Sequence, residues 1–423
     1  MLLGRPIAQR ALIALVQVLS LSVWFSVTAV VPSLTQQWGI SPTAAVWLTA
    51  SVQIGFVVGA VGSTALNLAD RIAPQVLLAV SAGGAAACTA AVTVLADGVS
   101  VAVPLRALTG FFLAGVYPVG MKLMASWSAP ADRGTAFGVL IGALTLGSAL
   151  PHLIGGIGPL PWRSVLLTAA ALSVLAALLA AFMIRTGPHL DGRRATPNPR
   201  YAIRMFTERG PRLANLGYFG HMWELYALWT WLATFVMLGR QERGEIASVS
   251  TGMVTFLAIG AAGVVGCLVG GWASDRFGRS PAAVAALAVS GACCVASPLF
   301  FAASFPVLLV FLLVWGAAVI ADSGVFSTSL SETADSRYVG TALTAQTAIG
   351  FLLTVVTIQL VPIAAQFVGW QFAFLLLAPG PAVGAIAMYA LRVRTTTKED
   401  LHVQPHSYRA PGGAVRGNVP DCR

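Results

Sequence analysis

Long apolar stretches separated by short polar segments run through this chain of 423 residues. A helix needs about 20 apolar residues to cross the hydrocarbon core of a bilayer, and twelve stretches reach that length. The pattern therefore predicts an all-α membrane protein with twelve transmembrane helices. The predicted spans are 11–34, 43–66, 75–96, 101–124, 135–157, 164–185, 213–238, 247–270, 281–303, 306–329, 340–367 and 371–392.

The polar segment 186–212 is the longest one between two spans, and it divides the chain. We expect an N-terminal six-helix bundle at 1–185, a cytoplasmic central loop at 186–212 and a C-terminal six-helix bundle at 213–393. The remaining residues, 394–423, are polar and carry Pro405, Gly412, Gly413 and Pro420. This composition predicts a disordered tail.

The composition excludes a soluble protein, because 57% of the residues are hydrophobic and only 9% are charged. Soluble domains carry about 25% charged residues, so the lipid bilayer must surround most of this chain. The net charge of +10 does not indicate nucleic-acid binding, since the Lys and Arg residues lie in short loops. The five cysteines form no CxxC pair, and we expect neither a metal site nor a cofactor.

The distribution of Lys and Arg predicts the orientation. If the N-terminus is cytoplasmic, the outer loops hold only Arg163, Arg240 and Arg243, and nearly all other cations lie inside. Loops on the cytoplasmic side are enriched in Lys and Arg. We therefore expect a multi-pass protein of the plasma (inner) membrane with both termini in the cytoplasm.

A short polar turn, GWASDRFGRS at 271–280, joins the eighth and ninth spans. Its pattern Gly-x-x-x-Asp-Arg-x-Gly-Arg resembles the signature loop of the major facilitator superfamily, and the chain is similar to bacterial transporters of that family. The resemblance implies that spans one, four, seven and ten line a central cavity, and that the loop locks one access state. The matching residues are Gly271, Asp275, Arg276, Gly278 and Arg279.

Several residues recur in the second half of the chain at a shift of 205 or 206, which predicts two halves built from one repeat. The resemblance implies parallel halves related by an axis along the membrane normal. The first-half loop carries Leu66, Ala73 and Pro74 where the signature has Gly, Gly and Arg, so we expect it to contribute less to switching. The recurring residues are Asp70–Arg71 with Asp275–Arg276, Gly134 with Gly340, Gly110 with Gly316 and Trp24 with Trp229.

Ionisable residues inside spans are costly and usually functional, and Arg106, Glu224 and Asp322 lie in spans four, seven and ten. His221 lies three residues before Glu224 and shares its helical face. Because desolvation disfavours the charged form of a carboxyl group, Glu224 is a candidate proton carrier. The alternative is a structural hydrogen bond to a neighbouring helix.

Asp322 is expected to pair with Arg106, to bind a coupling ion or to make a packing hydrogen bond. Arg106 and Gly110 form an Arg-x-x-x-Gly pattern similar to the fourth-span motif of proton antiporters in the superfamily. The resemblance implies a role of Arg106 in proton coupling, and the alternative is an arginine that snorkels to the outer surface.

Six aromatic residues on the expected cavity helices are candidates for contact with a solute: Trp24, Phe25, Tyr117, Trp223, Tyr226 and Trp229. The alternative is that they pack against neighbouring helices or anchor the protein at the membrane surface.

The sequence lacks a Walker loop, an HExxH motif and a dinucleotide fingerprint, so we expect neither ATP-driven transport nor an enzyme. It predicts a secondary active transporter that moves a small organic solute by alternating access, coupled to protons. Two alternatives stay open, a passive facilitator in which Glu224 and Asp322 are structural, and a membrane sensor built on a transporter fold. A monomer is compatible with the sequence.

Overall fold

A computed structural model describes residues 5–66, 68–129, 133–157, 160–189, 199–244, 249–335 and 338–402. The described residues are helical and contain no strand. The first half comprises α1 (Pro6–Leu21), α2 (Val31–Trp38), α3 (Pro42–Ala65), α4 (Leu68–Arg71), α5 (Pro74–Leu95), α6 (Val99–Leu113), α7 (Tyr117–Ser126), α8 (Arg133–Gly156) and α9 (Trp162–Phe182).

The second half begins with the short α10 (Pro199–Arg204). It continues with α11 (Arg209–Glu242), α12 (Thr251–Thr255), a π-helical segment (Phe256–Ala261), α13 (Ala262–Phe277), α14 (Arg279–Phe300), α15 (Phe305–Ala321), α16 (Ser323–Thr333), α17 (Val339–Val368), α18 (Trp370–Ala373), a 3-10 turn (Phe374–Leu377) and α19 (Pro379–His402).

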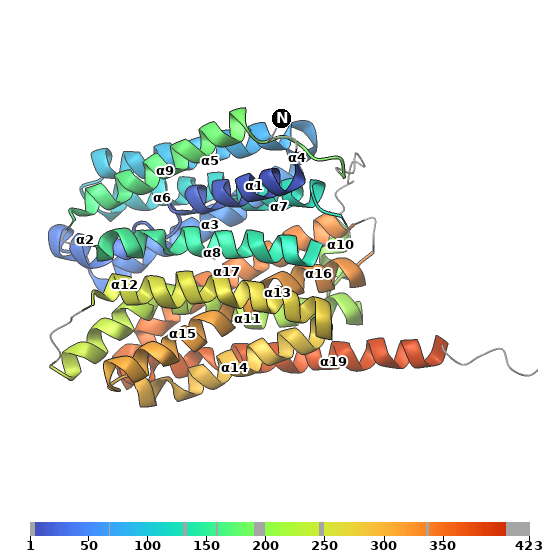
Figure 1. Ribbon diagram of the computed structural model, residues 1–423. Coiled ribbons are helices and arrows are strands. Elements are labelled where there is room, and N and C mark those ends of the chain that lie inside the picture. Colours follow the sequence, from blue (N-terminus) through green and yellow to red (C-terminus); the bar gives the residue numbers. More distant parts are fainter. Residues whose placement is uncertain are drawn as a thin grey trace, which may run out of the picture.

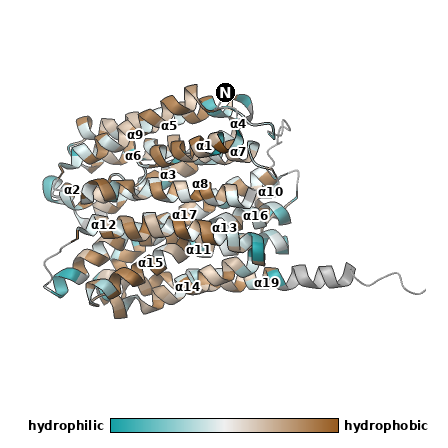
Figure 2. Cartoon of the chain, viewed as in Figure 1, coloured by the Kyte–Doolittle hydropathy of each residue, from teal (hydrophilic) through white to brown (hydrophobic). Residues whose placement is uncertain are grey.

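The long helices run side by side, with the first half above the second in Figure 1. Hydrophobic residues occupy the middle of the bundle, and hydrophilic residues gather toward its two ends (Figure 2). We call the end that carries Arg71, Asp275 and Arg279 the motif face, and the end that carries Gly39 and Gly156 the opposite face. This distribution of polarity is that of a helical bundle that crosses a membrane.

Within the described part of the chain, ten of the twelve crossing segments are helices long and apolar enough to span a bilayer. The first segment does not qualify because α1 has only 16 residues and is followed by an irregular turn at 22–27. The seventh, α11, has 34 residues, but its polar and charged side chains lower its hydropathy. The prediction of twelve spans in an all-α fold is confirmed. Within the predicted first span, 11–34, the helix is interrupted at 22–27.

Two predicted boundaries differ from the structure. The central segment 186–212 contains α10, and α11 starts at Arg209 within that segment. At the other end of the chain, α19 continues to His402, beyond the predicted end of the twelfth span. The rest of the predicted tail, 403–423, lies outside the described residues.

The repeat is visible in how glycines pack against carbonyl groups. A β-carbon on Gly110 would overlap the carbonyl oxygen of Val52, and one on Gly316 would overlap that of Ala258. Both members of the second pair are shifted by 206 residues from the first. Since glycine lets two helices approach closely, the α3–α6 contact recurs between the π-helical segment and α15. The two halves are therefore pseudo-symmetric.

Two contacts join the halves near the motif face. The helix α8 of the first half packs along α13 of the second, and α3 packs along α17. At the second contact, the hydroxyl groups of Thr64 and Thr344 lie 3.1 Å apart. These two pairs of helices are the boundary at which the halves would have to separate in any opening motion.

Candidate functional site

A cavity of about 400 Å³ lies between the two halves. Its wall is formed by α3, α7 and α8 from the first half and by α11, α15, α16 and α17 from the second. This volume lies within the range of small-molecule sites in proteins. The polar lining residues are Ser63, Thr64, Tyr117, Lys122, Tyr218, His221, Tyr226, Ser323, Ser327, Thr341, Thr344 and Thr347.

Six buried rings close this central cavity toward the opposite face, and we call them the aromatic layer: Trp24, Phe25, Phe56, Tyr226, Trp229 and Phe351. The layer joins the halves, because the ring of Phe56 in α3 lies 4.5 Å from that of Phe351 in α17. Trp24 lies 5.9 Å from Tyr226 of α11, and Phe25 lies 5.8 Å from Trp229. These rings therefore stand between the central cavity and the opposite face.

A second, smaller cavity of about 170 Å³ lies beyond the aromatic layer. On α11 the lining of the central cavity ends at Tyr226, and that of the second cavity begins at Thr230. His152 of α8 and Thr49 of α3 also line the second cavity. The aromatic layer thus separates two spaces that lie along the same boundary between the halves.

The central cavity contacts a buried polar cluster made by α11 and by the junction of α15 and α16. His221 Nδ1 lies 2.8 Å from Asp322 Oδ1, and both side chains are almost completely buried. The other ring nitrogen, Nε2, lies 2.8 Å from the hydroxyl of Ser323. Helix α15 ends at Ala321 and α16 starts at Ser323, so the break in this crossing segment brings Asp322 to the imidazole.

Glu224 lies outside the central cavity, inside the second-half bundle. Its Oε1 accepts hydrogen bonds from Ser290 Oγ at 2.5 Å and from Trp315 Nε1 at 2.6 Å, and Cys294 Sγ lies 3.2 Å away. Neither Glu224 nor any of these donors lines the cavity. Although His221 and Glu224 are one helical turn apart, they contact different neighbours.

Arg106 is completely buried in the first half. Its guanidinium donates to the carbonyls of Val23 and Trp24, with longer contacts to Leu48 O and Ser26 Oγ. These groups include the backbone freed by the break after α1, where no helical donor is available. Arg106 does not snorkel to a surface, and the alternative that pairs it with Asp322 is wrong.

The predicted aromatic candidates separate into three environments. Tyr117 lines the central cavity, whereas Trp24 belongs to the aromatic layer. Trp223 lies outside the cavity lining and donates from Nε1 to the carbonyl of Leu376 at 3.0 Å. Tyr117 and Tyr226, which both line the central cavity, are the aromatic candidates placed to touch a solute there.

The signature loop lies where α13 of the second half meets the first turn of α8. A β-carbon on Gly134 of α8 would overlap the carboxylate of Asp275, so this acid lies at the start of that helix, where an anion is favoured. Gly271 faces Gly138 of α8, since a β-carbon on Gly271 would lie 3.8 Å from the Gly138 Cα. The loop is therefore part of the contact between the halves.

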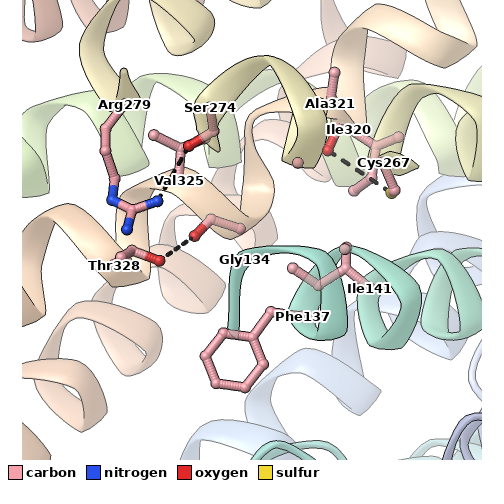
Figure 3. A pocket seen from close by; sticks show the side chains of 13 residues that line it. Gly134, Phe137, Ile141, Cys267, Ser274, Arg279, Ile320, Ala321, Val325 and Thr328 are labelled. Atoms are coloured by element: carbon pink, nitrogen blue, oxygen red, sulfur yellow. Dashed lines mark hydrogen bonds between the residues drawn. The ribbon is translucent and has the colours of Figure 1, made fainter. Parts of the chain in front are cut away.

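Arg279 links the signature loop to the end of α16. Its Nε lies 2.9 Å from Glu332 Oε1, its Nη1 is 3.3 Å from Ser274 Oγ, and Asp275 Oδ1 lies 3.7 Å away. Figure 3 shows Arg279 turned toward Ser274, with Phe137 and Ile141 of α8 across a narrow space. Gly278 has a φ of 92°, a conformation that suits glycine, and Arg276 is exposed.

The first-half loop shows less. Asp70 and Arg71 end the short α4, and the side chain of Arg71 is exposed; the side chain of Asp70 lies outside what the structure describes. Near this loop the halves are joined by the hydroxyl pair Thr64 and Thr344.

Residues that the sequence pattern does not single out as site candidates complete the cavity. Ser323 and Tyr218 contact or face His221, Phe351 belongs to the aromatic layer, and Lys122 is the only Lys or Arg among the described lining residues. Ser323 follows Asp322 directly in an apolar span, and this polar pair could have marked Ser323 as a site candidate. The sequence pattern groups Lys122 with the loop cations, because its span ends there.

Comparisons with known proteins agree with this architecture. A sequence profile of the Major Facilitator Superfamily matches residues 13–357. A gallate transporter of Pseudomonas putida is 28% identical over 303 residues, which cover 63% of this chain and 65% of that protein. A probable sulfoacetate transporter of Cupriavidus necator, SauU, is 28% identical over 233 residues, covering 49% of this chain and 51% of that protein. The aligned regions thus span about two thirds and one half of these relatives.

Solved structures resemble the whole helical bundle. The Escherichia coli fucose:proton symporter FucP superposes with a TM-score of 0.64 at 14% identity, over 91% of this chain and 99% of that one. The proton:xylose symporter XylE gives a TM-score of 0.69 at 15% identity, over 91% and 96% of the two chains. At these identities the likeness establishes the fold alone.

Proposed function

Because the chain belongs to the major facilitator superfamily, we propose that it is a secondary active transporter that moves a small organic solute by alternating access, driven by protons. It works in the plasma (inner) membrane with both termini and the motif face in the cytoplasm, and it is not an enzyme. The observation that carries the proposal is the central cavity between the halves, closed by the aromatic layer from a second cavity on the same boundary.

The aromatic layer supports a moving gate. The indole Nε1 groups of Trp24 and Trp229 are buried, and neither has a hydrogen-bond partner among the described residues. Leaving such a donor unpaired costs about 1–3 kcal/mol. A layer with two unpaired donors is less stable than a fully bonded one, which favours its rearrangement when a solute enters. The halves then separate on one face and close on the other.

The cavity favours a small organic anion as the solute. Lys122 supplies the one permanent cation of the described lining, and no Asp or Glu lines it. Tyr117, Tyr218 and Tyr226 add rings that can pack against an apolar body. Gallate and sulfoacetate, for which the two curated relatives are named, are both organic anions. This chemistry supports the same class of solute here.

The experiment uses purified protein in liposomes with an imposed pH gradient and a panel of gallate, sulfoacetate, benzoate, a sugar and an amino acid. We expect uptake of one organic anion to rise with the gradient, to collapse with a protonophore, and to carry protons. Uptake that ignores the gradient contradicts proton coupling and supports a facilitator. Binding without any flux contradicts transport and supports a sensor.

A further inference from the structure

The two nitrogens of His221 face different surroundings. Nδ1 lies 2.8 Å from the buried carboxylate of Asp322, which is absent from the cavity lining. Nε2 lies 2.8 Å from Ser323 Oγ, and both His221 and Ser323 line the central cavity. The imidazole therefore stands between a buried acid and the space proposed for the solute.

Glu224 offers a contrasting acid on the same helix. Three donors converge on its Oε1, and each of them belongs to α14 or α15. Glu224 and the donors are absent from the cavity lining. A proton arriving from the cavity meets His221 before either acid, and only Asp322 is in direct contact with that imidazole.

The charged and titratable groups around the pair are few. On α11 these are Tyr218, whose ring is 6.4 Å from His221, Glu224 one turn along, and Tyr226, which lines the same cavity. From α13, Cys267 is within electrostatic range of Asp322. Across the cavity α7 presents Tyr117 and Lys122, whereas the described lining residues of α3, α8, α15, α16 and α17 include no other titratable group.

These contacts specify a proton-binding step. When the imidazole is neutral with its proton on Nδ1, the Asp322 carboxylate lies 2.8 Å from that nitrogen. Nε2 then accepts a hydrogen bond from the Ser323 hydroxyl, and the His221–Asp322 pair carries one negative charge. A proton added at Nε2 makes an imidazolium and brings the net charge of the pair to zero. Nε2–H then donates either to the Ser323 oxygen, once that hydroxyl has rotated, or to another acceptor. An anion in the cavity can be that acceptor, since it no longer faces a net negative pair.

On the basis of the proposed function, we propose that His221 is the group at which proton and solute anion meet, with Asp322 as its positioning residue and Ser323 as the partner that the anion replaces. The proton binds Nε2 from the cavity and leaves the same atom after the anion has gone. Proton and anion therefore travel in the same direction. Glu224 holds α11 to α14 and α15 and does not exchange this proton.

The first test needs no solute. Protein labelled with [15N]histidine is titrated by NMR, and the His221 signal is identified by its loss in His221→Asn. Because a neighbouring charge moves a titration by about one pH unit or more, Asp322→Asn should shift the midpoint of this signal by about that amount. Glu224→Gln is the matched control, since its amide oxygen can still accept the three donors, and it should shift the midpoint by less than half as much.

The proposal is overturned if Asp322→Asn leaves the midpoint in place, if Glu224→Gln shifts it more, or if the signal does not titrate between about pH 4 and 9. If His221→Asn does not fold, the signal is identified as the one that Asp322→Asn shifts most, and a set of signals that none of the variants shifts overturns the proposal.

The second test counts protons on binding of an organic anion from the panel, by calorimetry in buffers of different ionisation enthalpy. Wild type and Glu224→Gln should take up one proton per anion, and His221→Asn should take up none. Equal uptake by His221→Asn contradicts the inference while leaving transport intact. Absence of binding in wild type contradicts the proposed solute class, and the ligand-free titration still decides the role of His221.

Discussion

The two halves contain the same broken crossing helix with different chemistry at the break. In the first half α6 ends at Leu113 and α7 starts at Tyr117, and the carbonyl of buried Val116 accepts a bond from Gln17 Nε2 at 3.1 Å. In the second half Asp322 stands at the position related to Val116 by the repeat, and it contacts His221. The backbone repeats, but the ionisable pair does not.

The comparison extends to Arg106. Its repeat-related position in α15 is Leu312, which is buried and apolar. The backbone near the two positions explains the difference. The helix α1 ends before a break at 22–27 whose carbonyls need a donor, whereas α11 continues unbroken from Arg209 to Glu242. The pseudo-symmetry therefore holds for helix packing, whereas each of these buried charges occurs in one half and has no charged counterpart in the other.

The largest effect is expected from Arg106→Leu, which places in the first half the leucine that stands at the repeat-related position, Leu312, of the second half. The carbonyls of Val23 and Trp24 lose a charged donor, and each lost bond of this kind costs about 1.5–3 kcal/mol. Thermal unfolding in detergent should show severe loss of folded protein. The exposed Arg71→Leu is the control, and a stable Arg106→Leu would contradict the role assigned to the cation.

A matched pair of glycine substitutions tests the symmetry itself. Gly110→Val and Gly316→Val each place carbon against a carbonyl oxygen of the neighbouring helix, and overpacking costs about 1–3 kcal/mol or more. Both variants should unfold at lower temperature, and by similar amounts. Gly62→Val, which has open space around it, should change little. Very different effects at Gly110 and Gly316 would speak against equivalent packing.

Asp275→Asn compares the two signature loops. An anion at a helix start is worth roughly 0.3–1 kcal/mol, so its loss should lower transport about twofold to fivefold without altering solute binding. Arg71→Gln in the first-half loop should have a smaller effect. Initial transport rates and binding isotherms measure the two properties separately. Unchanged turnover of Asp275→Asn at normal expression would rule out the lock.

The smallest effect is expected from Thr344→Val at the contact between α3 and α17. It removes one hydroxyl pair with a separation of 3.1 Å, and a hydrogen bond of this kind contributes about 0.5–1.5 kcal/mol. Only the part of this energy that differs between the open and closed arrangements of the halves affects the transport rate, so transport should change by less than about twofold. Thr341→Val, which also removes a hydroxyl from the cavity lining, is measured beside it. A tenfold loss in Thr344→Val alone would make this contact more important than the signature loop.

Most of the fold could be predicted from hydropathy, because a bilayer imposes the length of each span. The break after α1 could not, since residues 22–27 contain neither Pro nor Gly. The carbonyls of Val23 and Trp24 in this break accept hydrogen bonds from Arg106, which belongs to another helix. The residue pattern along a single helix does not contain such a partner. The charge in the fourth span was visible, but its partners depend on tertiary packing.

The site shows the same limit at His221 and Glu224. Their spacing of three residues placed them on one helical face, and it could not say which of them faces the cavity. Three residues fall about 60° short of a full helical turn, so the two side chains point in directions that differ by about that angle. This difference is enough for His221 to contact α16 and for Glu224 to contact α14 and α15. Sequence periodicity therefore identified the helix and the candidates, and packing divided them.

Transport by two variants that each neutralise one acid tests the central claim most directly. Counterflow of the transported anion, which needs no net proton movement, is compared with accumulation driven by a pH gradient. The account predicts that Asp322→Asn and Glu224→Gln keep counterflow within about twofold, and that only Asp322→Asn loses accumulation. Loss of accumulation in Glu224→Gln, with accumulation intact in Asp322→Asn, would contradict it.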